Sequence, residues 1–336
     1  MIAAATVFLA AQTARTLFPD DRQLQFAVPA LVLFWPTQSY MVATINNDNL
    51  ATLLSAWCAL ALARLFRQDV SWFTVLALAV GVLLAPYTKR SVFFLVPLIL
   101  FGGLVYMTFR GLSGLAGQRR RIAEMLLMSA VSVVLLAILM VFLSPAWAMA
   151  IAEPIRKIPG EVPLGVGSLL HMIASGTYRL PDRLEFYGES IRFAVKTLWA
   201  GFGWGTLLMP KAAYQTMGLV AAVALAGLML AAWRKVAARE RLQPWQTMSL
   251  LVFFFASVLF WAQILQVTIV SYPGVHYAPG RYLLTLLIPT SILLVLGLRQ
   301  WVPRPLHQIF IHVLLATMIL FDAVSLVLTI IPFHYG

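Results

Sequence analysis

Charged residues are scarce in this sequence of 336 residues: they make up 11% of the chain, whereas 61% is hydrophobic and the mean hydropathy is +0.88. In soluble globular domains, about a quarter of the residues are charged. A soluble globule of this length could not bury so much apolar surface, but a lipid bilayer accommodates it. The scarcity of charge therefore excludes a soluble domain and predicts a protein embedded in the lipid bilayer.

Cysteine and acidic residues are also rare. The single Cys58 lies inside an apolar run, so no intramolecular disulfide can form,. The 12 acidic residues against 24 basic ones give a net charge of +12. The basic residues lie in short clusters between apolar runs, and no basic face with interleaved aromatic residues is present,. We therefore predict no nucleic-acid partner.

Motifs for cofactor chemistry are lacking as well. The sequence has no GxxxxGK[ST] phosphate-binding loop, no HExxH zinc motif and no serine-hydrolase elbow,. His307 and His312 are five residues apart, a spacing that does not place them on one helix face, and no third ligand is evident,. The sequence predicts no cofactor and assigns no metal-ligand residues, it leaves a divalent metal open without supporting one, and it gives no support to ATP-driven chemistry.

Long apolar runs, in contrast, recur along the chain. A helix needs about 20 residues to cross the hydrocarbon core, and these runs lack the alternation of barrel strands. We predict an all-α fold with a single transmembrane domain over residues 1–336, a polytopic bundle of about ten spans. The predicted spans are 2–17, 24–41, 47–66, 71–86, 91–109, 122–143, 213–233, 247–271, 279–298 and 307–332.

Basic residues are divided unevenly between alternate loops. One set of loops holds Arg22, Arg64, Arg67, Arg110, Arg119, Arg120, Arg121, Arg234, Lys235, Arg239, Arg241, Arg299 and Arg304. The short loops opposite hold Lys89, Arg90 and Arg281. The positive-inside rule assigns the richer set to the cytoplasm. Both termini and the long loop 144–212 are therefore predicted to be extracytoplasmic.

The loop 144–212 contains one amphipathic segment. Apolar side chains share one helical stripe, namely Leu184, Tyr187, Ile191, Val195 and Leu198. Charged side chains share another, namely Glu185, Glu189, Arg192 and Lys196. We predict a helix that lies on the membrane surface or packs on the rim of the bundle, and both interpretations stay open.

Three amides and a carboxylate crowd the turn Asn46-Asn47-Asp48-Asn49 at the predicted outer mouth of the bundle. Asn46 or Asn47 is expected to cap the following helix, with Asp48 favoured in its first turn by the helix dipole. In the functional interpretation, Asp48 also binds an acceptor hydroxyl, an amine or a metal ion.

The next outer turn reads Tyr87-Thr88-Lys89-Arg90. Two adjacent cations on this side run against the positive-inside bias, and charges near lipid tend to mark function. An anion at membrane level, such as a phosphate, is their natural partner. The alternative is that both side chains extend to lipid head groups.

A third outer turn runs from Tyr272 through His276 to Arg281 and Tyr282. Arg281 opens a predicted helix, and a cation at a helix N-terminus opposes the dipole. It is therefore expected to have an anionic partner, which is Asp48, Asp322 or a ligand phosphate.

Several short motifs resemble those of bacterial GT-C type membrane glycosyltransferases, which include protein O-mannosyltransferases and the aminoarabinose transferase of lipid A. The stretch 36–66 is similar to the family's second outer turn and following helix, and Tyr87-Thr88-Lys89 is similar to a Leu-Thr-Lys turn. The segment 199–204 with Pro210, and Gly280-Arg281-Tyr282-Leu283, resemble segments of uncharacterised members.

The resemblance implies a GT-C-like bundle in the bacterial inner membrane that moves a sugar from a polyprenyl-phosphate donor to an unknown acceptor on the extracytoplasmic face. By position, Asp48 corresponds to a second acidic site of the family and is the expected catalytic residue, and Lys89, Arg90 and Arg281 correspond to cations that face the donor phosphate. The residues implied in substrate binding are Asn46, Asn47, Tyr87, Lys89, Arg90, His276, Arg281 and Tyr282.

The chain departs from the family at its start. The family's principal catalytic acid lies in a first outer loop, and this chain begins in what resembles the helix after that loop. We expect a truncated or degenerate member that lacks the N-terminal helix and first catalytic loop. The alternatives are a transporter or flippase of a lipid-linked saccharide, and a non-catalytic subunit of an envelope-glycan complex.

Overall fold

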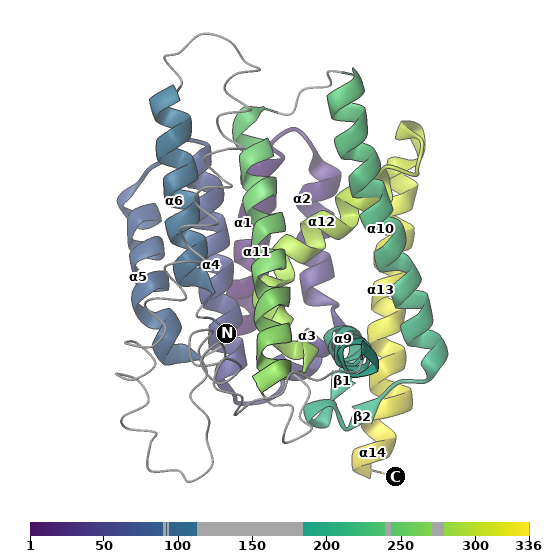
Figure 1. Cartoon of the computed structure of the whole chain (residues 1–336). Coiled ribbons are helices and arrows are strands. Elements are labelled where there is room, and N and C mark those ends of the chain that lie inside the picture. Colours follow the sequence, from purple (N-terminus) through teal and green to yellow (C-terminus); the bar gives the residue numbers. More distant parts are fainter. Residues whose placement is uncertain (90–91, 93, 113–183, 239–242, 271–278, 336) are drawn as a thin grey trace. The chain divides into compact units, whose positions relative to one another are not determined.

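A computed structural model of the chain describes residues 1–89, 92, 94–112, 184–238, 243–270 and 279–335 (Figure 1). The chain divides into two compact units. Unit 1 comprises Met1–Ile99, Phe193–Phe260 and Pro279–Gly336, and unit 2 comprises Leu100–Arg192 and Trp261–Ala278. All the contacts discussed below lie within unit 1.

The described elements are helical apart from one short hairpin (Figure 1). The α-helices are α1 (Ile2–Leu17), α2 (Arg22–Leu33), α3 (Pro36–Val42), α4 (Asn47–Phe66), α5 (Trp72–Thr88), α6 (Leu95–Leu112), α9 (Leu184–Ala200), α10 (Lys211–Ala238), α11 (Pro244–Val270), α12 (Leu287–Arg299), α13 (His307–Ser325) and α14 (Ile331–Tyr335). The shorter elements are β1 (Gly201–Phe202), η2 (Gly203–Gly205), β2 (Leu207–Leu208), η4 (Gly280–Leu286), η5 (Arg304–Leu306) and the π-helical η6 (Leu326–Ile330). In the hairpin, Gly201 pairs with Leu208 and Phe202 with Leu207. The predominance of helices among the described residues confirms the predicted all-α fold.

Within the described residues, several helical segments are long and apolar enough to cross a membrane. They are Asn47–Phe66, Lys211–Arg234, Pro244–Ala262, Gly280–Arg299 and Arg304–Phe333. Shorter apolar helices are Ile2–Leu17, Trp72–Leu84 and Leu95–Thr108. These segments support a membrane-embedded protein. The predicted span 122–143 and residues 144–183 of the predicted loop lie outside the described residues.

The predicted single span 24–41 is instead two helices. Helix α2 ends at Leu33, and α3 begins at Pro36 after Trp35, whose backbone is extended (ψ 115°). The residue before a proline is disfavoured in the helical region, because the proline ring clashes with its backbone and Cβ. Proline at the first position of a helix is well tolerated, so the chain restarts there. The break starts a new helix, which leads into the Asn-rich turn.

Unit 1 is organised around α4 and the continuous segment η4–α12. In the most apolar stretch of each of these two segments, 78% is buried inside the protein, whereas 17% is buried in Lys211–Arg234 of α10. Helix α4 packs against α1, α5 and η4, and α12 runs obliquely from η4 to a close packing with α10 (Figure 1). The buried α4 and η4 thus bring their N-terminal ends together.

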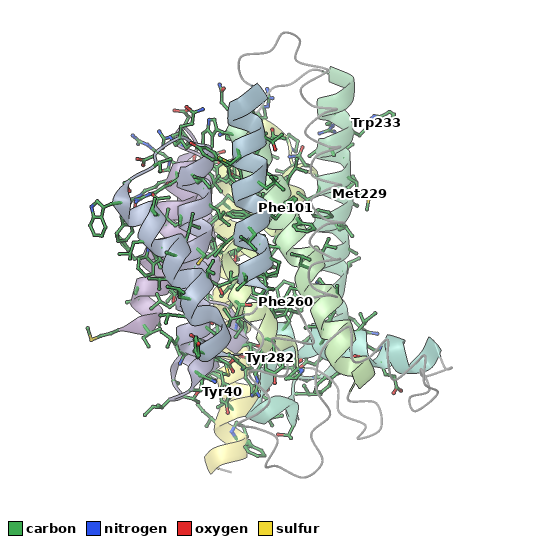
Figure 2. The ribbon with its side chains drawn as sticks, turned by 60° about the vertical axis from the view of Figure 1, so that its left-hand side comes forward. Tyr40, Phe101, Met229, Trp233, Phe260 and Tyr282 are labelled. Atoms are coloured by element: carbon green, nitrogen blue, oxygen red, sulfur yellow. The ribbon has the colours of Figure 1, made fainter. Side chains whose placement is uncertain are left out.

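Apolar side chains cover the outer surface of α10. Met229 and Trp233 are 63% and 70% exposed and project outward from the helix (Figure 2). A surface of large exposed apolar side chains marks a site that contacts a membrane or another protein. For a helix of this length, a bilayer provides that contact.

Helix α9 confirms the predicted helix within the loop 144–212. Its C-terminal part packs on unit 1, since Ala194, Leu198 and Trp199 are buried. The indole ring of Trp199 stacks on that of Trp35, with centroids 4.4 Å apart. For residues 193–200 the structure therefore shows packing on the helical unit, whereas a membrane-surface position of the preceding residues stays a prediction.

Candidate functional site

The turn before α4 is held by its own amides. The Asn46 side chain accepts a hydrogen bond from the backbone N–H of Asn49 (3.2 Å), which confirms the predicted N-cap,. The Asn49 side chain donates to the carbonyl oxygens of Met41 (3.0 Å) and Thr44 (2.9 Å). These amides satisfy backbone groups at the end of α3 and the start of α4. Asn46 and Asn49 thus have structural partners, and Asp48 is the charged group that the turn presents.

A second contact joins this turn to the end of α5. The Asn47 side chain donates to the carbonyl oxygen of Thr88 at 3.3 Å. Because α4 and α5 pack side by side, this bond lies where the start of one meets the end of the other. The next residue, Lys89, is thereby brought over the first turn of α4.

Asp48 lies between two cations from distant parts of the sequence. Its Oδ1 accepts a hydrogen bond and ion pair from Lys89 Nζ. Its Oδ2 lies 3.8 Å from Nε of Arg281, the second residue of η4. The side chains of Asp48, Lys89 and Arg281 are 9%, 16% and 7% exposed. The structure therefore brings together the three charged residues that the sequence analysis singled out on separate turns.

Tyr282 completes this cluster. Its ring centroid lies 4.3 Å from Lys89 Nζ and 5.7 Å from Arg281 Cζ. The negative face of an aromatic ring attracts both cations, which otherwise repel each other. Figure 2 shows Tyr282 toward the same end of unit 1 as Tyr40, which follows the break before α3.

Of these three charged side chains, two are positive and one is negative. Partial burial, and secondly the charge of Arg281, lower the pKa of Lys89 from 10.5 to about 7,. An anion that enters the cluster would favour the charged form of Lys89 and would also attract Arg281. The arrangement can therefore hold an anion beside a carboxylate.

The remaining predicted site residues are placed differently. Tyr87 is 85% exposed on α5 and is not part of the buried cluster. Arg90 and His276 lie outside the described residues. Asp322, the other candidate partner of Arg281, instead accepts a hydrogen bond from the Ser39 hydroxyl at 3.1 Å. The anionic partner of Arg281 among the described residues is therefore Asp48.

His307 has a structural role at the other end of α12. Its Nδ1 accepts a hydrogen bond from Arg299 Nε at 2.8 Å, and its Nε2 lies 2.9 Å from the carbonyl oxygen of Val302. Arg299 also forms an ion pair with Asp21. In the part of the chain that the structure describes, no three His, Cys, Asp or Glu side chains are grouped to hold a metal ion.

Sequence reasoning missed one contributor to the site, Thr197 of α9. Its hydroxyl oxygen accepts the backbone N–H of Gly280, which immediately precedes Arg281, at 2.6 Å. The two residues are 83 positions apart. A threonine within an amphipathic helix carries no signal of such a contact, because the pairing depends on how α9 packs against η4.

Comparisons with known proteins identify no relative: no family model, no curated protein and no solved structure matches the chain.

Proposed function

We propose that this chain is a polytopic membrane glycosyltransferase of GT-C type, with about ten spans, which moves a sugar from a polyprenyl-phosphate donor to an acceptor on the extracytoplasmic face. One observation carries the proposal: Lys89, which follows the shorter apolar helix α5, and Arg281 converge on Asp48 at the starts of two segments that are long and apolar enough to cross a membrane. A lipid-linked phosphate is an anion held at the membrane surface, and its leaving charge needs stabilisation by cations.

The distribution of basic residues supports an extracytoplasmic position for the cluster. Arg64 and Arg67 lie at the end of α4 opposite Asp48, and Arg299 lies at the end of α12 opposite η4. Cytoplasmic helix ends carry the excess of Lys and Arg. The end that carries the cluster is then the outer end, in the inner membrane of a bacterium.

The proposed chemistry divides the charges between two tasks. The donor phosphate binds Lys89 and Arg281 and competes with Asp48 for them, which frees the carboxylate. The acceptor hydroxyl then gives its proton to Asp48 and bonds to the anomeric carbon, and the bond from that carbon to the phosphate oxygen breaks. Its electron pair stays on the phosphate, where the two cations stabilise it.

A transporter or flippase of a lipid-linked saccharide would use the same cations. Transporter sites lie near the bilayer midplane between broken helices. The described cluster instead lies at the first turn of α4 and just beyond the end of α5. This position favours the transferase.

Binding to a polyprenyl phosphate tests the proposal directly. We expect the protein in lipid nanodiscs to bind a polyprenyl phosphate more tightly than the matching polyprenol, as measured by native mass spectrometry. Lys89→Gln and Arg281→Gln should each weaken phosphate-lipid binding about 10- to 100-fold, because each removes a charge-assisted hydrogen bond. Lys211→Gln and Arg304→Gln, at exposed positions outside the cluster, are the matched controls and should bind as the wild type does. Equal affinity of a folded Lys89→Gln variant and the wild type would remove the phosphate site.

Asp48→Asn separates transfer from binding alone. Loss of the carboxylate leaves Lys89 and Arg281 without their competitor, so phosphate-lipid affinity should rise about tenfold or more. Transfer of a radiolabelled sugar from its polyprenyl-phosphate donor to an acceptor in isolated membranes should fall to background, because the variant lacks the carboxylate base. Removing one partner of a buried ion pair is destabilising, so both assays need a variant that is shown to be folded. Full transfer by Asp48→Asn would exclude Asp48 as the base, whereas the absence of transfer by a wild-type protein that binds the phosphate lipid would favour the transporter.

A further inference from the structure

The backbone that carries Arg281 is fixed by one side chain of α9. The N–H of Gly280 donates to Thr197 Oγ1 at 2.6 Å, and this bond is buried. The Thr197 hydroxyl donates its own hydrogen to the carbonyl oxygen of Phe193 at 2.8 Å. A hydroxyl has one hydrogen to donate and two acceptor lone pairs. Its bond to Phe193 therefore leaves the oxygen free to accept from Gly280.

Gly280 also lies directly against the backbone of α9. A Cβ atom at this position would collide with the carbonyl oxygen of Ala194 and with the backbone nitrogen of Leu198. Glycine is thus required for the close approach, whatever its φ angle. With backbone against backbone, the start of η4 cannot shift along α9 without losing the Thr197 bond.

The end of α9 is in turn tied to the segment that leads to Asp48. Trp35 Nε1 donates to the carbonyl oxygen of Leu198 at 2.8 Å, and the Thr37 hydroxyl donates to that of Thr197 at 3.2 Å. Thr37 Oγ1 also accepts from the N–H of Gly201 at 3.1 Å. All three contacts are buried. One turn of α9 therefore joins the α3 segment, which precedes Asp48, to η4, which carries Arg281.

We infer that Thr197 is a positioning residue for the anion site: it holds Arg281 at the distance from Asp48 and Lys89 at which both cations reach one phosphate. The inference rests on the proposed function, since it assigns Thr197 a role in phosphate-lipid binding. Thr197 touches neither the ligand nor Asp48 in this account and acts through Gly280 and Arg281. Its hydroxyl matters and its methyl group does not.

Two substitutions at position 197 separate the hydroxyl from the bulk of the side chain. Thr197→Val keeps the shape and loses the acceptor, so we expect polyprenyl-phosphate affinity in nanodiscs to fall about tenfold, which corresponds to about 1.4 kcal/mol. Thr197→Ser keeps the hydroxyl and should stay within about twofold of the wild type. Thr197→Ala removes the hydroxyl without adding bulk and repeats the test if the valine variant does not fold. Thr13→Val is the matched control, because Thr13 is also fully buried and, among the described residues, its hydroxyl bonds to the carbonyl oxygen of Leu9 in its own helix.

A double-mutant cycle with Arg281→Gln distinguishes positioning from general destabilisation. If Thr197 acts through Arg281, Thr197→Val should lower affinity in the wild type but add less than about twofold in the Arg281→Gln background. Equal losses in both backgrounds would overturn the inference, as would a folded Thr197→Val or Thr197→Ala variant that binds like the wild type. A wild-type protein that binds no polyprenyl phosphate would overturn the proposed function, and the inference with it.

Discussion

Lys89 follows the last residue of α5, and 16% of its side chain is exposed. Unlike Arg281, which keeps its charge, a partly buried lysine can lose its proton near neutral pH. With a pKa of about 7, its charge depends on the surrounding solution and on whether an anion is bound. At the scale of single residues, this makes Lys89 the adjustable part of the site.

Phosphate-lipid binding should therefore weaken as the pH rises above about 7. Lys89 binds an anion only when protonated, and a bound phosphate would in turn raise its pKa. A phosphate monoester already carries most of its second negative charge at pH 7, since its second pKa is about 6. We expect affinity to fall between pH 7 and 9 by up to the roughly 10- to 100-fold that Lys89 contributes. Native mass spectrometry or a filter-binding assay across this range measures the effect.

Lys89→Arg supplies the control for this titration. Arginine stays protonated throughout the range, so the affinity of this variant should be nearly independent of pH. A wild-type profile as flat as that of Lys89→Arg would show that Lys89 keeps its charge and would contradict the lowered pKa.

At the scale of elements, α10 and α12 pack backbone against backbone. A Cβ on Gly227 would collide with the carbonyl oxygen of Gly297, and a Cβ on Gly297 with that of Ala224. Trp301 Nε1 also donates to the carbonyl oxygen of Val223 at 2.9 Å. Small residues let two membrane helices approach backbone to backbone. This pairing anchors the oblique α12, whose other end continues from η4.

Alanine at these glycines should separate the two helices. We expect Gly227→Ala and Gly297→Ala each to lower the free energy of unfolding by about 1–3 kcal/mol, because overpacking forces backbone shifts. Thermal unfolding in detergent measures the change. Gly218→Ala on α10 is the control: a Cβ there meets nothing within 4 Å, so this variant should be neutral or more stable by up to about 1 kcal/mol. Equal stability of all three variants would contradict the close packing.

Several elements were predictable because their signals are local. The apolar runs identified α1, α4 and α5 to within a few residues, and the Asn cap fixed the start of α4. The break before Pro36 also had a local cause, but the apolar composition on both sides concealed it. The 3₁₀ geometry of η4 is not visible in the sequence, because it depends on the packing of Gly280 against α9.

At the scale of the whole molecule, the contacts that make the site could not be predicted. The sequence indicated that Arg281 needs an anionic partner, but it did not distinguish between Asp48, Asp322 and a ligand phosphate as that partner. The choice of Asp48 depends on α4 packing against both α5 and η4, which no local pattern specifies. The ion pair of Arg281 with Asp48 identifies the partner among the described residues, and the carboxylate of Asp322 instead accepts a hydrogen bond from Ser39.

The proposed orientation predicts which helix ends face the cell exterior. Cys58 is fully buried, so the native chain should react little with a thiol reagent. Lys211→Cys lies at the start of α10 and Arg304→Cys at the start of η5, and both positions are exposed. We expect a membrane-impermeant maleimide on intact cells to label the cysteine at position 211, and to label the one at position 304 only after permeabilisation. The reverse pattern would place the Asp48 cluster on the cytoplasmic side.

A lipid phosphate bound against Lys89 and Arg281 brings its phosphorus atom close to the lysine Nζ. Solid-state NMR measures this contact through the dipolar coupling between the ³¹P of a bound polyprenyl phosphate and ¹⁵Nζ of labelled lysine. We expect dephasing of the ³¹P signal by ¹⁵N in the wild type, its loss in Lys89→Gln and its retention in Lys211→Gln. A bound lipid whose ³¹P signal shows no dephasing in the wild type, or the same dephasing in Lys89→Gln, would contradict a phosphate site at Lys89.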